Sequence, residues 1–426
     1  MMDLKKLDGP FGIPVFHQQM PEMVNAVSLG WSIFTGAGDD AAFGAPGLHH
    51  WLEHVPFKGT KRYSAGADKI RGPFIPYNGN INARTNLVTT SYFGTVHKHQ
   101  WREALSVITD LVSNPLLADE SIYAERRVIH QEISEHLGSA DGVAAYNLPG
   151  ILYPGHPFSY PVLGSETSLA AIEPDTLRMA HRLGYDRSRA IFTCVGNISD
   201  IDLLEALSRA AVDLPDHNLS ERRRPANFGP LPIWKPGKTE IETEFAASVI
   251  YMLFPITQND GSTVAMTRAV RMCHLLNMVF GYGKAISPLM STVRGRRQLV
   301  YGCSPCWRVF SGGGYFGFQA QAKKENSQAI VDAFYDVLND SSLRSTERLG
   351  GMKSSSKAII EMMPINPPDF REKAISQYIN CGGEMISSKA NIDWFNGLTI
   401  ADIDVALTGL RPENARIIIF KGMGKT

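Results

Sequence analysis

The chain has 426 residues, enough for two or more domains of ordinary size, and its 44% hydrophobic and 20% charged content is typical of a globular protein. Its formal net charge is zero, so bulk charge indicates no polyanionic partner and disfavours nucleic-acid binding. The five cysteines are dispersed and odd in number, which argues against a disulfide scaffold and favours a reducing compartment.

Hydropathy predicts neither secretion nor membrane insertion. Residues 1–6 are followed by no apolar core of the kind that a signal peptide has, and they do not form an Arg- and Ser-rich presequence. No stretch of about 18 apolar residues exists to span a membrane. We therefore expect a cytoplasmic protein with no membrane partner, provided that no targeting segment has been removed.

The first predicted elements are a strand and a helix that carries two histidines. Apolar residues alternate with small or polar ones over residues 27–33, which is the period of a strand. Pro46 and Gly47 then suit the start of a helix. On that helix His50 and His54 lie four residues apart and share one face, where two imidazoles can hold one metal ion.

Glu53 completes the inverted zincin order, H-x-x-E-H, in which the glutamate serves as general base. It lies next to His54 and can reach a water on the metal. The motif is short, and the chain holds 12 histidines, so three ordinary side chains on a solvated helix face are the alternative. The segments that follow favour the metal site.

Residues 79–85 are polar and lead into a predicted strand at 90–96. Short side chains, Asn82 and Ala83 among them, suit an edge strand that could pair with an extended peptide. An ordinary edge strand is the alternative, and this stretch by itself favours it.

Helical spacing is evident over residues 101–112 and again from Asp119, as a cap, to about Leu137. On the second helix Glu125, Glu132 and His136 share one stripe, which is either a solvated face or a set of groups that bind a cation. Because an open catalytic zinc site needs a third protein ligand, Glu132 and Glu125 are the best-placed candidates, with His136 as an alternative.

The rest of the chain has weaker secondary-structure signals. Residues 139–187 read as a Gly-, Pro- and Tyr-rich connector with short helical pieces, and 189–197 as a buried strand with its turn. In the second half we predict a helix over 287–294 and a strand over 299–302.

The second half repeats the first in outline. Residues 92–94 (Tyr-Phe-Gly) recur at 315–317, and 189–191 recur loosely at 416–418, at nearly equal offsets. We predict an α+β protein of two homologous α/β domains, each a mostly antiparallel sheet flanked by helices. The expected parts are a metal-binding domain, a Pro-rich linker and a metal-free domain, at residues 1–213, 214–237 and 238–426.

These landmarks together resemble the pitrilysin/insulinase-type zinc metallopeptidases, in particular the small two-domain branch that includes the mitochondrial processing peptidase subunits and their bacterial relatives. The resemblance covers most of the chain and is strongest over residues 25–200. The matching segments are Gly47-Leu48-x-His50-x-x-Glu53-His54, Phe57-Lys58-Gly59-Thr60, Asn82-Ala83-x-Thr85, Thr90-x-Tyr92, Glu125-Arg126-x-Val128-Ile129-x-x-Glu132-Ile133, His156-Pro157, Gly164 and Gly196-Asn197.

The resemblance implies a zinc site in the first domain. His50, His54 and Glu132 match the zinc ligands of the family, with one zinc per chain. Glu53 matches the base that activates the attacking water. Glu125 matches the supporting acidic residue two turns before the ligand on the same helix.

The resemblance also implies a substrate site made by both domains. Asn82 and Ala83 match the edge that binds the substrate backbone as an added strand, and Arg294 and Tyr301 resemble the pair that the second domain contributes near the scissile carbonyl. In some relatives the metal motif and this pair are divided between two subunits. Both occur in this chain, which favours a homodimer and leaves a heterodimer with a related chain possible.

Two positions depart from the family pattern. Gly79-Asn80 stands where relatives have two glycines, which puts the flexibility of that loop in question, and Trp51 replaces a smaller aromatic residue. The function expected is that of a zinc endopeptidase acting on peptides or unfolded protein segments. The alternatives are a non-catalytic structural or partner subunit of a heteromeric peptidase, and a chamber that binds peptides without hydrolysis.

Overall fold

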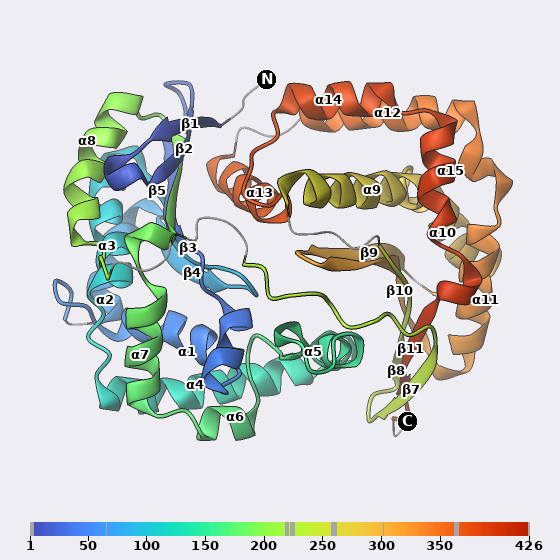
Figure 1. Cartoon of the computed structure of the whole chain (residues 1–426), viewed down its shortest axis with the longest axis horizontal. Helices are drawn as coiled ribbons and strands as arrows, with labels where there is room; N and C mark the ends of the chain where they lie inside the picture. The colour runs from blue at the N-terminus through green and yellow to red at the C-terminus, as the bar shows by residue number, and fades with distance from the viewer. Residues whose placement is uncertain are drawn as a thin grey trace.

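Two mixed β-sheets, one in each half of the chain, organise the structure, which is a computed structural model (Figure 1). The structure describes residues 4–64, 66–217, 221, 226–256, 262–300, 302–361 and 366–424. Helices and sheets together make the predicted α+β fold.

The first sheet has six strands in the order β1-β2-β6-β3-β5-β4. Only β2 and β6 run parallel, and the other neighbours are antiparallel. The strands are β1 (Lys5–Asp8), β2 (Pro14–Gln19), β3 (Ala26–Ile33), β4 (Asn80–Thr85), β5 (Thr90–His97) and β6 (Ala190–Gly196). The predicted edge segment is therefore the outermost strand, β4.

The second sheet has five strands in the order β7-β11-β8-β10-β9, again with one parallel pair, β7 and β11. These are β7 (Gly237–Thr243), β8 (Ala247–Pro255), β9 (Cys303–Phe310), β10 (Gly313–Lys323) and β11 (Arg416–Gly422). The order matches β2-β6-β3-β5-β4 strand for strand. The repeated segments 92–94 and 315–317 lie on the equivalent strands β5 and β10, which confirms the predicted repeat.

Helices cover both sheets. In the first half they are α1 (Leu48–His54), α2 (Ala67–Ile70), α3 (Trp101–Ser113), α4 (Asp119–Leu137), α5 (Ala140–Leu152), α6 (Glu166–Ala170), α7 (Pro174–Gly184) and α8 (Asp200–Ala210). In the second half they are α9 (Thr263–Gly281), α10 (Pro288–Met290), the π-helical turn η10 (Ser291–Arg296), α11 (Ser327–Leu338), α12 (Thr346–Glu361), α13 (Pro367–Asn380), α14 (Ser388–Gly397) and α15 (Ile400–Thr408). No helix among the described residues is long and apolar enough to cross a membrane.

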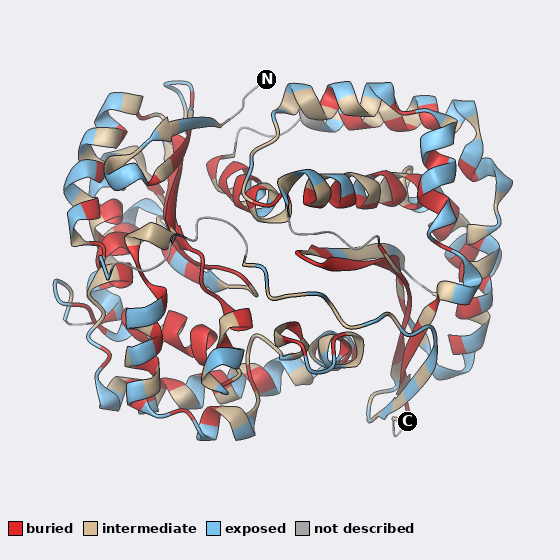
Figure 2. Ribbon diagram, in the orientation of Figure 1, coloured by how far each residue is buried: buried red, intermediate tan, exposed pale blue. Residues whose placement is uncertain are grey.

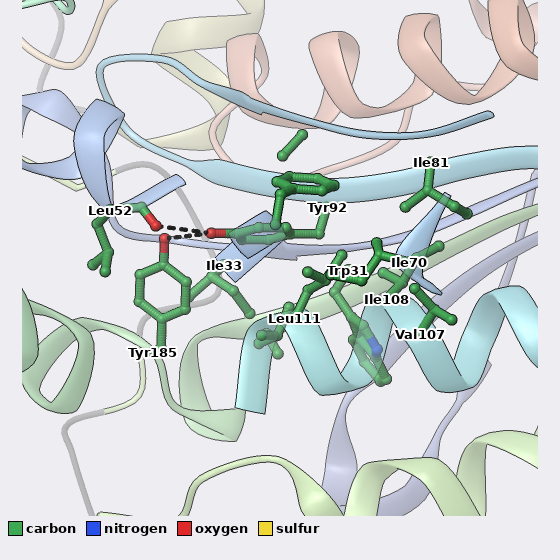
Figure 3. Close-up of a cluster of buried hydrophobic side chains, with 14 of the residues drawn as sticks. Trp31, Ile33, Leu52, Ile70, Ile81, Tyr92, Val107, Ile108, Leu111 and Tyr185 are labelled. Atoms are coloured by element: carbon green, nitrogen blue, oxygen red, sulfur yellow. Dashed lines mark hydrogen bonds between the residues drawn. The ribbon is translucent and has the colours of Figure 1, made fainter. Parts of the chain in front are cut away.

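The core of the first half lies between its sheet and helices α1 and α3 (Figure 3). Trp31 of β3 is fully buried and donates its indole N–H to Thr109 of α3 at 2.9 Å. Tyr92 of β5 is also fully buried, and its hydroxyl lies 3.3 Å from that of Tyr185 and 3.4 Å from the carbonyl of Leu52. These contacts attach the helix that carries the histidines to the sheet.

One helix from each half packs against the sheet of the other half. Helix α5 packs on β8 and β11 of the second sheet, and α13 packs on β3 and β6 of the first. Figure 2 shows β3 and much of α13 buried where they face each other. Arg371 of α13 is buried there, donates to the hydroxyl of Ser28 at 3.1 Å and stacks over the ring of Phe93.

Three local predictions are wrong. The connector at 139–187 is largely helical, because α5 is stabilised by the second sheet despite Pro149 within it. Leu299, Val300 and Gly302 lie outside any strand, and β9 begins at Cys303. Asp119 is the first residue of α4 and not its cap, which is Ala118.

The described residues of the Pro-rich segment, 214–217, 221 and 226–236, contain no helix or strand. Trp234 nevertheless ties the segment to the second half by donating to the carbonyl of Asn414 at 2.8 Å. The domain limits drawn from the sequence stay a prediction.

Candidate active site

Helix α1 is held at its N-terminus by a buried carboxylate. Asp40 accepts the backbone N–H of Gly47 at 2.8 Å and that of His49 at 3.1 Å, two groups that a helix start leaves unpaired. It also contacts the His49 ring at 2.6 Å, and the other ring nitrogen lies 3.1 Å from the hydroxyl of Thr35. His49 is thus a buried support and not a ligand.

The same helix start requires two glycines. Gly47 has a φ of 91°, and a side chain there would meet the backbone of Gly164 at 2.8 Å. Gly164 in turn would press on Pro46. This close contact between backbones fixes where α1 begins, and it explains why Gly164 belongs with the motif although it lies far along the chain.

Helices α1 and α4 bring His50, His54 and Glu132 together, as the sequence predicted. One ligand atom from each lies within 4.8 Å of the others. The Glu132 carboxylate is 3.7 Å from Nε2 of His50 and 3.6 Å from Nε2 of His54. Tetrahedral bonds of about 2.0–2.1 Å would place zinc ligand atoms roughly 3.4 Å apart, so the three side chains fit a zinc ion and leave a fourth position open.

The residues behind the ligands orient them. Glu125, two turns before Glu132 on α4, lies 2.9 Å from Nδ1 of His54, which leaves Nε2 directed toward Glu132. The other Glu125 oxygen is 2.6 Å from the ammonium group of Lys58. Glu125, which the family resemblance implied as a supporting residue, thus contacts both His54 and Lys58, and its role in the site stays a prediction.

The imidazoles of His50 and His54 have their pKa values shifted in opposite directions. Burial, with the nearby His54, lowers the pKa of His50 to about 3, so His50 is neutral and can offer a lone pair. Burial also opposes the charged form of His54, but Glu125, Glu132 and Glu53 outweigh it and raise the pKa of His54. A site that favours a positive charge amid three carboxylates suits a divalent cation.

Glu53 is buried beside this cluster, with only 8% of its surface exposed. Burial raises the pKa of its carboxyl group, while the hydroxyl and backbone N–H of Thr85 donate to it and partly offset that effect. Thr85 ends the edge strand β4, so the carboxylate and the edge are physically joined. Sequence reasoning quoted Thr85 within a motif and gave it no role.

Asn82 and Ala83 lie in the middle of the edge strand. Asn82 is exposed and Ala83 is buried, as expected of neighbours on a strand. Helix α1 packs against β4, so this free edge runs beside the histidines.

A cavity of about 1030 Å³ opens between the two halves. Its wall includes Arg84 and Thr85 of the first half and residues 305–311 of the second. His136, one turn beyond Glu132 and predicted as an alternative ligand, lies on this wall and outside the metal cluster. The end of the edge strand, at Arg84 and Thr85, therefore lines this cavity.

The structure does not bring Arg294 to the metal cluster. Arg294 is exposed on η10, which packs against α10 and α11, and these helices lie on the opposite side of Figure 1 from α1. Tyr301 lies outside the described residues. The predicted role of this pair at the scissile carbonyl stays a prediction.

Three residues that position the site were missed. Asp40 lies well before the helix that it caps, and Lys58 follows that helix, so only the folded chain shows what they contact. Thr85 is recognisable only once β4 and α1 are seen side by side.

Two family models together cover most of the chain. The model described as Insulinase (Peptidase family M16) matches residues 22–166, and the model described as Peptidase M16 inactive domain matches residues 171–343. The first match contains every residue of the candidate metal site. The chain belongs to peptidase family M16.

Curated relatives carry related names. A Bacillus subtilis protein named uncharacterized zinc protease YmxG is 31% identical over 42% of each chain, and a Rickettsia bellii protein named uncharacterized zinc protease is 24% identical over 75% of this chain and 74% of its own length. The probable mitochondrial-processing peptidase subunit beta of Schizosaccharomyces pombe is 30% identical over 37% of this chain and 34% of that protein. The first and third matches therefore span less than half of those relatives.

Solved structures share the fold. A protease from Helicobacter pylori superposes with a TM-score of 0.86 at 16% identity, covering 99% of this chain and 100% of that one. A peptidase M16 inactive domain from Pseudomonas fluorescens gives a TM-score of 0.82 at 17% identity, with coverage of 99% and 100%. At these identities the likeness concerns the fold alone.

Proposed function

We propose that this chain is a zinc-dependent endopeptidase that hydrolyses peptides or unfolded protein segments. The observation that carries the proposal is the convergence of His50, His54 and Glu132 within 4.8 Å, with the buried carboxyl group of Glu53 beside them. Two imidazoles and one carboxylate, with one position open, are a donor set of catalytic zinc sites. We propose one zinc ion per chain.

When bound, a zinc ion would lower the pKa of a water molecule toward neutrality and polarise a substrate carbonyl. Glu53 is placed to take the proton from the attacking water and to return it to the leaving amine. Thr85 lowers the pKa of the Glu53 carboxyl group through its hydroxyl and backbone N–H, and it would help to orient the base before substrate arrives. Glu125 and Lys58 keep His54 in the tautomer that presents Nε2.

The edge strand supports a preference for extended chains. A peptide added alongside Asn82 and Ala83 would pair its backbone with β4 and pass the histidines of α1. A folded protein would not enter a cavity of about 1030 Å³. We propose peptides and unfolded segments as substrates for this reason.

The assembly and location remain part of the proposal. We propose a homodimer in the cytoplasm, because one chain carries all the motifs of the family and its five cysteines are free in the structure. A non-catalytic subunit is the competing function, since one relative is named as a subunit of a processing peptidase. The intact set of His50, Glu53, His54 and Glu132 favours catalysis.

The test is Glu53→Gln, assayed on an unfolded protein substrate with zinc supplied. Removing the base should reduce kcat by about 10²–10⁴-fold, the usual contribution of general acid–base catalysis. Zinc binding and thermal unfolding should stay near those of wild type, because Glu53 is not a proposed ligand. Cleavage by the variant at the wild-type rate would refute the mechanism, and an inactive zinc-loaded wild type would favour the non-catalytic subunit.

A further inference from the structure

A group of polar side chains lies in the cavity wall, at and beside the second sheet. Arg308 of β9 stands directly opposite Tyr315 of β10 in the strand register, and both line the cavity. Tyr153, the residue after α5, lines the same wall, and its ring packs edge-to-face on Phe310. Three polar side chains from three elements therefore gather at one place.

Arg308 is exposed and brings a positive charge to the cavity wall. The other guanidinium of the cavity wall, Arg84, is paired with Glu372 at 2.9 Å. Within the part of the chain that the structure describes, Arg308 has no acidic partner, and its side-chain hydrogen bond goes to the neutral Tyr315. The nearby Asp141 is itself in contact with Gln319 at 3.5 Å.

The two phenols add hydrogen-bond donors. Tyr153 is 5% exposed, and its hydroxyl has no hydrogen-bond partner among the described residues, which is unfavourable unless a ligand or water supplies one. Burial, and to a smaller extent the neighbouring Tyr315, raises the pKa of Tyr153 well above its usual value. The phenol therefore keeps its hydrogen and can donate it.

We propose that Arg308, Tyr153 and Tyr315 form a subsite that binds a carboxylate group of the peptide substrate. A guanidinium can hold both carboxylate oxygens, and a buried phenol can donate a further hydrogen bond to the same group. Because Arg308 and Tyr315 lie on the second sheet and the proposed catalytic residues lie in the first half, the subsite would anchor a peptide that crosses the cavity. The inference rests on the proposed peptidase function and adds its substrate preference.

A peptide offers carboxylates of two kinds, an acidic side chain and the C-terminal carboxylate. Both present the same group to Arg308, so the experiment must separate them. Binding can be measured without cleavage in the full-length Glu53→Gln chain, which keeps the proposed ligands and the subsite. Three fluorescent peptides of one sequence serve as probes: an amidated peptide with one Gln, the same peptide with Glu at that position, and the Gln peptide with a free C-terminus.

We expect the Glu peptide, the free-acid peptide or both to bind about tenfold or more tightly than the neutral peptide, as measured by fluorescence anisotropy at fixed salt. Arg308→Gln should abolish this preference, whereas the conservative Arg308→Lys should keep part of it. Tyr153→Phe should reduce the preference for carboxylate-bearing peptides about threefold or more. Tyr123→Phe, which removes an exposed hydroxyl on α4, is the matched control and should leave it unchanged.

Preference for one probe identifies the source of the carboxylate, and either source supports the subsite. Equal binding of all three peptides, or a preference that survives Arg308→Gln, would overturn it. An absence of peptide binding would overturn it too, and cleavage of an unfolded protein by the wild type would then decide the peptidase function separately. If the wild type cleaves nothing but the carboxylate preference holds, the peptidase function fails and the subsite stands.

Discussion

The two halves share five equivalent strands in the same order, yet only the first has a metal cluster among the described residues. In the first half, α1 and α4 meet over the sheet and bring two histidines and a glutamate together. In the second half, the long helix α9 is an apolar core helix, and the conspicuous polar group is Arg308 on the edge strand. Equivalent strands thus present different polar groups in the two halves, because a few side chains on helices or edges differ.

The exchanged helices make the halves dependent on each other. Helix α13 covers a face of the first sheet and α5 a face of the second, so β3 is buried on both sides. The cavity between the halves is consequently lined by residues from both parts of one chain. Differences between the halves can be tested without separating them.

The largest expected loss in the free energy of unfolding comes from a substitution at the start of α1, in the first half. Gly47→Ala would place a methyl group 2.8 Å from Gly164 at a φ of 91°, and it should destabilise the protein by about 3 kcal/mol or more. Gly155→Ala is the matched control: its φ is 77°, but nothing lies within 4 Å of the added atom. The control should lose only about 1 kcal/mol. Denaturant unfolding measures both, and equal losses would show that the contact between glycines does not matter.

A smaller effect, on zinc affinity, is expected from a substitution of Glu125, which contacts His54 of the metal cluster. Glu125→Gln removes the charge beside Nδ1 of His54 and should weaken zinc affinity about 10- to 100-fold. Glu120→Gln, an exposed acid in the first turn of the same helix, should leave affinity unchanged. Competition with a chelator measures both. Unchanged affinity in Glu125→Gln would mean that α1 alone fixes the ligand geometry.

A third effect, which is absent at neutral pH, is on the pH dependence of the unfolding free energy. Burial lowers the pKa of His181 to about 4, and its ring contacts the carbonyl of Val112 at 2.8 Å. The unfolded chain takes up this proton near pH 6.5, so the stabilising contribution of neutral His181 is complete above that pH and is lost as pH falls toward 4. His181→Gln should therefore flatten the fall in unfolding free energy between pH 6.5 and 4. An unaltered slope would mean that His181 titrates normally.

The sequence was most informative where local signals and contacts agree. Helix α4 ends at Leu137 before Gly138 as expected, and the spacing of His50 and His54 placed both on one face. Helix α5 was missed because Pro149 and two glycines argue locally against a helix, while its stability comes from the opposite sheet.

Dependence on contacts with distant parts of the chain also explains why some residues of the site were not predicted. Asp40 caps a helix seven residues away, and Arg308 and Tyr153 meet only in the folded cavity. A motif can show which residues are able to bind a metal, whereas support and substrate contacts depend on pairs far apart in the chain. The position of Arg294 on η10 could not be predicted from the sequence for the same reason, since its spacing from Tyr301 does not show which helices η10 packs against.

The most direct test of the central claim is the zinc content of the purified chain, measured beside His54→Ala and Glu132→Gln. We expect about one zinc per wild-type chain and loss of zinc in both variants, each still folded. A wild type that takes up no zinc after reloading, or variants that keep it, would contradict the assignment of His50, His54 and Glu132 as the metal site.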